Sequence, residues 1–241
     1  MKNLILICVV LLFGSAFTFA QSKYDNMILK AETAYEKGDY NSAIKALNKF
    51  EKKSSKKLGK QNQYTPIYYM RLAKYKLASG FLPEFESNLQ TAITRSESVY
   101  QGINFKKGLI LLDAAELYIQ NGSYRIAKEY LAQSKKMLDP ESSFTDDIKA
   151  RWDVDMAEAL TGQGFFNESI QILKSRELYF VGRGVKQETF VDDKGNLKSR
   201  RLSEDDITKR LKEYANFLTL LCNSYGRQGN FTSLEIGRAH V

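Results

Sequence analysis

Apolar and small residues recur along this chain with a period of 42 residues. Four glycines mark the period: Gly38, Gly80, Gly122 and Gly164. An alanine stands seven residues before each of them, at Ala31, Ala73, Ala115 and Ala157. A leucine stands nine residues after each, at Leu47, Leu89, Leu131 and Leu173. Several columns aligned at one spacing predict an internal structural repeat.

Within each period, apolar residues at helical spacing precede the glycine and resume after it. Each unit is therefore predicted to be a helix, a turn and a second helix, with glycine at the turn because it tolerates backbone angles that other residues resist. The alanine column lets two helices approach closely, and the leucine column fills the space between neighbouring pairs. Because one unit cannot bury its apolar face alone, the units are expected to stack.

After the fourth unit the pattern is interrupted and then resumes. Residues 179–202 change character, and "ETFV" followed by "DDKGN" and "LKSRR" predicts a small β-hairpin with its turn at residues 193–196. Ser203, with three acidic residues after it, predicts a helix start. That helix belongs to an incomplete fifth unit over residues 203–234, with Gly229 at its turn.

The stretches "AYEKGDYNSAIKAL" and "AAELYIQNGSYRIAKEYL" resemble tetratricopeptide (TPR) repeats. The 42-residue period resembles the longer variety found in kinesin light chain and in exported bacterial proteins. The resemblance covers four units over residues 24–178 and resumes at 203–234, although Phe85 and Ser169 replace a usual alanine. It implies an all-α fold, a right-handed α-solenoid of helix-turn-helix repeats, here with a small β-hairpin insertion.

The two ends of the sequence do not follow the repeat. Residues 1–20 combine Lys2, a short apolar run and small residues before Ala20, an order typical of a cleaved bacterial signal peptide. We therefore expect an exported protein, periplasmic or secreted, with no stable membrane span after cleavage. At the other end, residues 235–241 abandon the repeat and resemble read-through of a sequencing adapter, so we expect the natural protein to continue beyond Leu234.

The residue types needed for catalysis are scarce. The single histidine, His240, lies in the aberrant tail, and with it set aside no histidine-dependent triad or histidine metal site is available. After loss of the leader one cysteine is left, Cys222, which takes the alanine column of the fifth unit and is expected to be a buried thiol. The sequence therefore predicts a protein that is not an enzyme and needs neither a cofactor nor a metal.

Charged residues on the first helix of each unit are the candidate binding residues. Asp113 and Glu116 recur 42 residues later as Asp155 and Glu158, and repeat two offers Arg71 and Lys74 in the same columns. A spacing of three puts both members of each pair on one helix face. In TPR arrays these helices line the concave groove, so the acidic pairs are candidates for contact with a basic peptide. The alternative is that they pair with neighbouring helices or are solvated.

Lysines dominate the segment from Lys45 to Lys60, which carries seven of them. The whole chain has a formal net charge of +8. Such a cluster favours contact with an anionic surface or partner, unless it is a solvated helix end. Nucleic acid is not expected as a partner of an exported protein.

The leading functional hypothesis is an exported, non-enzymatic TPR scaffold whose groove binds a protein or peptide segment. The alternative is that these residues form the sensing or docking region of a larger enzyme, a CHAT-type protease or a sensor histidine kinase. The downstream sequence would distinguish the two.

Overall fold

The computed structural model describes residues 23–138, 146–181, 187–191, 197–201 and 203–229, with side chains described outside residues 181–202. The chain divides into two compact units, Met1–Leu117 and Tyr118–Val241. The predicted leader, the hairpin turn at 193–196 and the tail at 235–241 lie outside the described residues.

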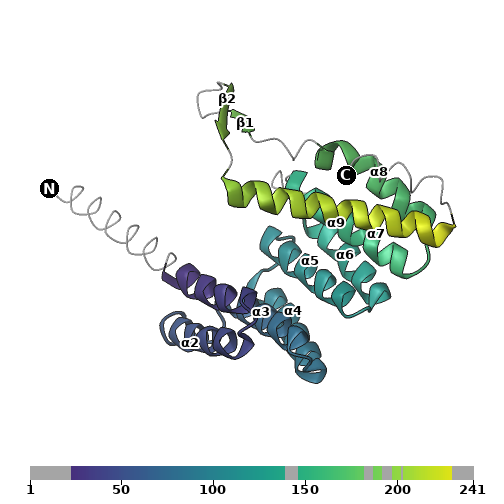
Figure 1. Cartoon of the computed structure of the whole chain (residues 1–241). Coiled ribbons are helices and arrows are strands. Elements are labelled where there is room, and N and C mark those ends of the chain that lie inside the picture. Colours follow the sequence, from purple (N-terminus) through teal and green to yellow (C-terminus); the bar gives the residue numbers. More distant parts are fainter. Residues whose placement is uncertain (1–22, 139–145, 182–186, 192–196, 202, 230–241) are drawn as a thin grey trace. The chain divides into compact units, whose positions relative to one another are not determined.

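The first unit is built of antiparallel helix pairs (Figure 1). A helix over residues 23–36 is followed by α2 (Tyr40–Leu58), α3 (Thr65–Ala78), α4 (Leu82–Val99) and α5 (Phe105–Gln120), whose last turn belongs to the second unit. Helix α3 packs against both α2 and α4. Proline occupies the first turn of α3 and of α4, where its missing N–H costs no helical hydrogen bond.

The second unit continues the alternation with α6 (Tyr124–Leu138), α7 (Asp146–Gly162) and α8 (Phe166–Val181). Two short strands, β1 (Gln187–Val191) and β2 (Leu197–Arg201), pair antiparallel, with Thr189 opposite Ser199. Helix α9 (Glu204–Gln228) then packs against α8 (Figure 1). Ser203 caps α9 as predicted, since its Oγ accepts a hydrogen bond from the Asp206 amide at 3.1 Å.

The repeat glycines form the predicted turns. Gly38, Gly80, Gly122 and Gly164 all have positive φ, between 76° and 87°. In each turn the glycine N–H donates to the carbonyl three residues back, as Gly38 does to Tyr35 at 2.9 Å. The next residue donates to the carbonyl five back, as Asp39 does to Ala34 at 3.0 Å. This Schellman ending satisfies carbonyls at the helix end and requires a left-handed residue, which explains the glycine.

The predicted packing columns are confirmed. All four alanines and all four leucines are fully buried, with 0% exposure. Phe85 and Ser169, which replace the usual alanine, are also fully buried. Ser169 is accommodated because its hydroxyl lies 2.8 Å from that of Thr161 and 3.3 Å from that of Ser224. Cys222 is only half-buried, so the expectation of a buried thiol is wrong.

Each unit has its own apolar core. In the first, the rings of Tyr24, Phe50 and Tyr64 meet with centroids 5.3–6.1 Å apart. In the second, Phe180 stacks on Phe217 at 4.6 Å. No helix in the described part of the chain is long and apolar enough to cross a bilayer.

Candidate functional site

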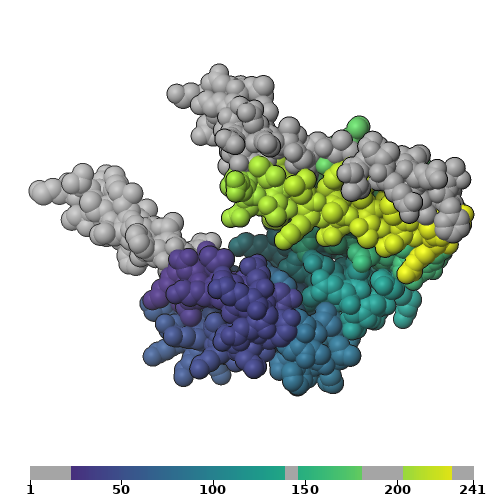
Figure 2. All heavy atoms as spheres, viewed as in Figure 1, coloured from purple at the N-terminus to yellow at the C-terminus, as the bar shows by residue number. Residues whose placement is uncertain are grey.

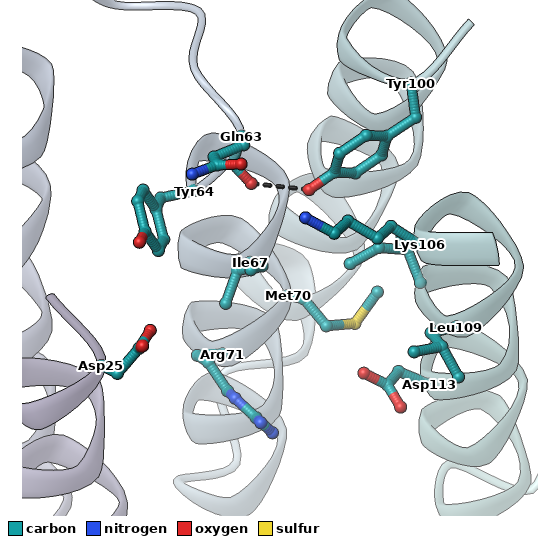
Figure 3. Close-up of a pocket in the computed structure, with 11 residues that line it drawn as sticks. Asp25, Gln63, Tyr64, Ile67, Met70, Arg71, Tyr100, Lys106, Leu109 and Asp113 are labelled. Carbon is teal, nitrogen blue, oxygen red and sulfur yellow. Dashed lines mark hydrogen bonds between the residues drawn. The ribbon is translucent and has the colours of Figure 1, made fainter. Parts of the chain in front are cut away.

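A cavity of about 280 Å³ opens on the first unit, between helices that hold the first position in successive repeats. Its lining comes from the helix over residues 23–36, the loop before α3, α3 itself, the residue that follows α4, and α5 (Figure 3). The first helices of three repeats therefore meet at one site, as expected for the groove of a TPR array.

The floor of the cavity is apolar. Ile67 and Met70 come from α3, and Leu109 comes from α5 (Figure 3). Ile110, also of α5, completes the floor. Met70 and Ile110 are almost fully buried, so they form part of the core as well as the floor. Ile67 and Leu109 are 42 residues apart, which shows that the repeat brings equivalent positions side by side.

Four charged side chains surround this floor: Asp25, Arg71, Lys106 and Asp113. They come from three different helices (Figure 3). Lys106 is exposed, and no ion pair joins it or Asp25 to another described residue. The rim therefore offers at least one cation and one anion to an occupant of the cavity.

Two tyrosines form the upper wall of the site. The Tyr100 hydroxyl donates to the Gln63 carbonyl oxygen at 2.6 Å, which fixes its ring (Figure 3). The Tyr64 hydroxyl is buried and has no hydrogen-bond partner among the described residues. Burial raises the Tyr64 pKa and the charges of Asp25 and Tyr24 raise it further, while the Gln63 side chain lowers it by a smaller amount. A buried donor without a partner is costly, so an occupant offering an oxygen would be stabilised here.

Arg71 and Lys74 both pair with Glu32 on the preceding repeat. The Glu32 carboxylate lies 2.9 Å from Arg71 Nε and 3.3 Å from Lys74 Nζ. It also accepts a hydrogen bond from the Tyr75 hydroxyl at 3.1 Å. Glu32 and Lys74 are 42 residues apart, so equivalent positions of neighbouring repeats carry opposite charges. Both predicted cations therefore pair with a carboxylate on a neighbouring helix.

Aromatic rings extend this cluster. Tyr35 stacks on Tyr75 with centroids 4.8 Å apart, and Lys74 Nζ lies 4.6 Å from the centre of the Tyr35 ring. Burial raises the pKa of Tyr35, and the charges of Tyr40, Glu32 and Glu116 raise it further. Glu116 therefore lies close to this cluster.

The predicted acidic pairs are distributed over the two units. Asp113 and Glu116 lie on α5 in the first unit, half-buried, and Asp113 lines the cavity. Asp155 and Glu158 lie on α7 in the second unit. Asp155 is 8% exposed with its carboxylate 4.0 Å from Arg151 Nε, whereas Glu158 is exposed. A binding role for the six predicted residues stays a prediction.

Of the residues that line the cavity, the sequence analysis identified only Arg71 and Asp113. Among those it missed are Asp25, Tyr64 and Lys106. The 42-residue register relates Asp25 to Ile67 and Leu109, and Tyr64 to Lys106. The equivalent positions in other repeats carry residues of a different type, apolar where Asp25 is polar and charged where Tyr64 is neutral. The 42-residue pattern therefore gives no signal at these positions.

Several tyrosines of the first unit should make its stability sensitive to alkaline pH. Burial raises the pKa of Tyr68 to about 12, with a contribution from the charge of Glu51. Burial and Glu32 raise the Tyr75 pKa as well. A phenol whose folded pKa exceeds its unfolded value stabilises the fold below that unfolded value, about 10, and loses this contribution as pH rises through the folded value.

We expect the free energy of unfolding to fall between about pH 10 and pH 12, with Tyr68 contributing about 1 kcal/mol because its phenol is only half-buried. Urea unfolding at several pH values measures this. The Tyr68→Phe variant should show a shallower decline. An identical decline in both proteins would remove Tyr68 as a cause.

In the part of the chain that the structure describes, no cluster of three or more His, Cys, Asp or Glu side chains is arranged to hold a metal ion. The cavity itself combines an apolar floor with charged side chains and the phenols of Tyr64 and Tyr100.

The fold is a TPR-like array of helical repeats. The crystal structure of nearly identical TPR-like repeats from a candidate kinesin light chain of Podosopora anserina is similar, with a TM-score of 0.62, 14% identity, and coverage of 90% of this chain and 92% of that one. A second crystal structure of those repeats, carrying a single substitution, gives a TM-score of 0.63 and 13% identity, covering 91% of this chain and 92% of that one.

The crystal structure of a tetratricopeptide repeat protein from Parabacteroides merdae also matches, covering 90% of this chain and 77% of that one at 17% identity. Its TM-score is only 0.33, too low to support a conclusion about the fold. No protein-family model matches the sequence, and no curated protein matches it. The likeness to the kinesin-light-chain repeats establishes the fold.

Proposed function

We propose that this protein is a non-enzymatic interaction scaffold whose first unit binds an extended peptide segment at the cavity between α3 and α5. The observation that carries the proposal is the combination of an apolar floor, a charged rim and a buried phenol without a partner among the described residues, on helices that hold the groove position in the repeats. TPR-like arrays generally serve as protein-interaction scaffolds, which supports this class of function.

The size of the cavity favours a side chain as its occupant. At about 280 Å³ it lies just below the roughly 300–1,000 Å³ typical of small-molecule and cofactor sites. An apolar side chain would contact Ile67, Met70 and Leu109, while its backbone carbonyls would approach Tyr64 and Lys106. Extended peptides bound in this way gain affinity from a few anchors in pockets.

A displayed library of random peptides, selected against the protein, tests the proposal. Selected peptides are then titrated against Leu109→Trp, which fills the cavity, and against Leu82→Trp as a matched control, since Leu82 is 51% exposed on α4 outside the cavity. We expect Leu109→Trp to weaken binding by about tenfold or more and Leu82→Trp to change it by less than about twofold, because only the former removes an anchor contact.

A selection that yields no enriched peptide, or peptides that bind both variants equally, would reject the cavity as the binding site. Circular dichroism of both variants establishes that they fold. The Lys106→Glu variant then tests whether the charge at the rim determines peptide preference. We expect it to bind peptides with basic residues beside the anchor better than peptides with acidic ones.

A further inference from the structure

Helix α2 presents a face made of lysines. Its six lysines and the one just after it are all exposed: Lys45, Lys49, Lys52, Lys53, Lys56, Lys57 and Lys60. We call this set the α2 lysine face. At 3.6 residues per turn the six helical lysines cover an arc of about 140° and extend for about 18 Å along the axis.

The opposite side of α2 is committed to the core. Ala43, Leu47, Phe50 and Ser54 are buried, and they hold the helix against the rest of the first unit. The orientation of the lysines is therefore fixed by packing. In Figure 2 the blue-violet atoms of the first repeat form a continuous near surface of this unit.

The lysines are not neutralised by their surroundings. No ion pair joins any of the seven to another described residue. The one carboxylate of α2, Glu51, accepts a hydrogen bond from Ser55 at 2.6 Å and lies close enough to Tyr68 of α3 to raise its pKa, after the larger effect of burial. Its carboxylate therefore contacts Ser55 and forms no ion pair with any of the seven lysines.

From this arrangement we propose that the α2 lysine face docks the protein on the surface of an anionic lipid bilayer. The charge complementarity is of the kind seen where four to eight basic residues on one helix meet acidic headgroups. This inference is independent of the cavity between α3 and α5, because the two sites share no residue.

The residue type favours a bilayer over a folded acidic partner. Every cation of the α2 lysine face is a lysine, and none is an arginine. Arginine presents a rigid fork suited to fixed carboxylates or phosphates, whereas lysine is a flexible, hydrated point charge. Flexible charges on an exposed helix match a surface whose own charges diffuse laterally, and they need no matching geometry.

Vesicle sedimentation tests the proposal, using protein from Gln21 onward, which keeps every described residue. The probe is a vesicle of phosphatidylglycerol in phosphatidylcholine, compared with phosphatidylcholine alone. We expect binding to the anionic vesicles only. It should be lost between about 0.1 M and about 1 M salt, because the screening length falls from about 10 Å to about 3 Å.

Two charge-matched variants locate the contact. The first replaces Lys45, Lys49, Lys52 and Lys56 by Gln. The control replaces four exposed lysines of the second unit by Gln: Lys136, Lys149, Lys209 and Lys212. Both lose the same net charge, and unchanged melting curves establish folding. We expect about a tenfold or greater loss of vesicle affinity for the first and less than about a threefold change for the control.

Three outcomes would overturn the proposal. Equal losses in the two variants would mean that net charge, and not the α2 lysine face, drives association. Equal binding to neutral vesicles would mean that the contact is not electrostatic. Binding of the protein to a soluble polysulfated polysaccharide through the same four lysines, with no binding to anionic vesicles, would assign the face to an acidic polymer instead.

Discussion

Replacing Glu32 by Gln is expected to lower the free energy of unfolding of the first unit by about 2 kcal/mol. The carboxylate holds two cations of the next repeat and the hydroxyl of Tyr75, and its side chain is only 16% exposed. Glutamine keeps the shape and one acceptor but leaves Arg71 and Lys74 without their anion. Because the two cations are about 30% exposed, water compensates part of the loss, which keeps the expected effect below that of a fully buried pair.

Urea unfolding of the wild type and the variant measures this difference. Glu36→Gln is the matched control, since Glu36 is an exposed carboxylate one turn further along the same helix. It should change the free energy of unfolding by less than about 0.5 kcal/mol. If both variants unfolded at the same urea concentration, the Glu32 cluster would contribute nothing specific.

A double-mutant cycle separates the cluster from the general charge of the helix. Lys74→Gln alone leaves Arg71 in place and should cost less than Glu32→Gln. In the Glu32→Gln background, Lys74→Gln should cost little or become favourable, because the ammonium no longer has its partner. Additive effects would show that the two side chains do not interact across the repeats.

The parts of the fold that depend on backbone geometry and close packing were predictable from the sequence. The positive φ of Gly38 and its equivalents leaves little choice of residue, so the turns are visible as a strict period. The same holds for Ala73 and Leu89, which are fully buried where helices meet. These requirements recur in every repeat, and a recurring requirement produces a recurring residue.

The candidate site was less predictable, because it depends on how columns of different chemistry combine. Arg71 and Lys74 were identified as charged residues on a helix face, but the pairing with Glu32 needs the stacking of two repeats. Asp25, Tyr64 and Lys106 have no equivalents of the same type in other repeats. A binding site depends on residues that differ from one repeat to the next. The 42-residue period therefore identifies the helices and turns of the fold, but not the residues that line the cavity.

The Gly162→Ala substitution is expected to lower the free energy of unfolding of the second unit by about 1–3 kcal/mol. Gly162 is the last residue of α7, and a Cβ built there would overlap the ring of Tyr124 at the start of α6. Its backbone is helical, so in an open position alanine would gain up to about 1 kcal/mol over glycine. Gly162→Ala is therefore expected to destabilise the protein, whereas the same substitution at an ordinary helical glycine stabilises it.

Removal of the Tyr124 ring should abolish the destabilisation caused by Gly162→Ala. In a Tyr124→Ala background, Gly162→Ala has room for its methyl group and should be neutral or stabilising, which gives a coupling of about 1–3 kcal/mol between the two positions. Tyr124→Ala keeps the backbone carbonyl that accepts from Gln163 Nε2 at 3.3 Å, so the cycle reports on the ring alone. Urea unfolding of the four proteins measures the coupling. If Gly162→Ala stabilised the wild-type protein, the Tyr124 ring would have to move away without an energetic cost. The contact between α6 and α7 would then not determine how the third and fourth repeats stack.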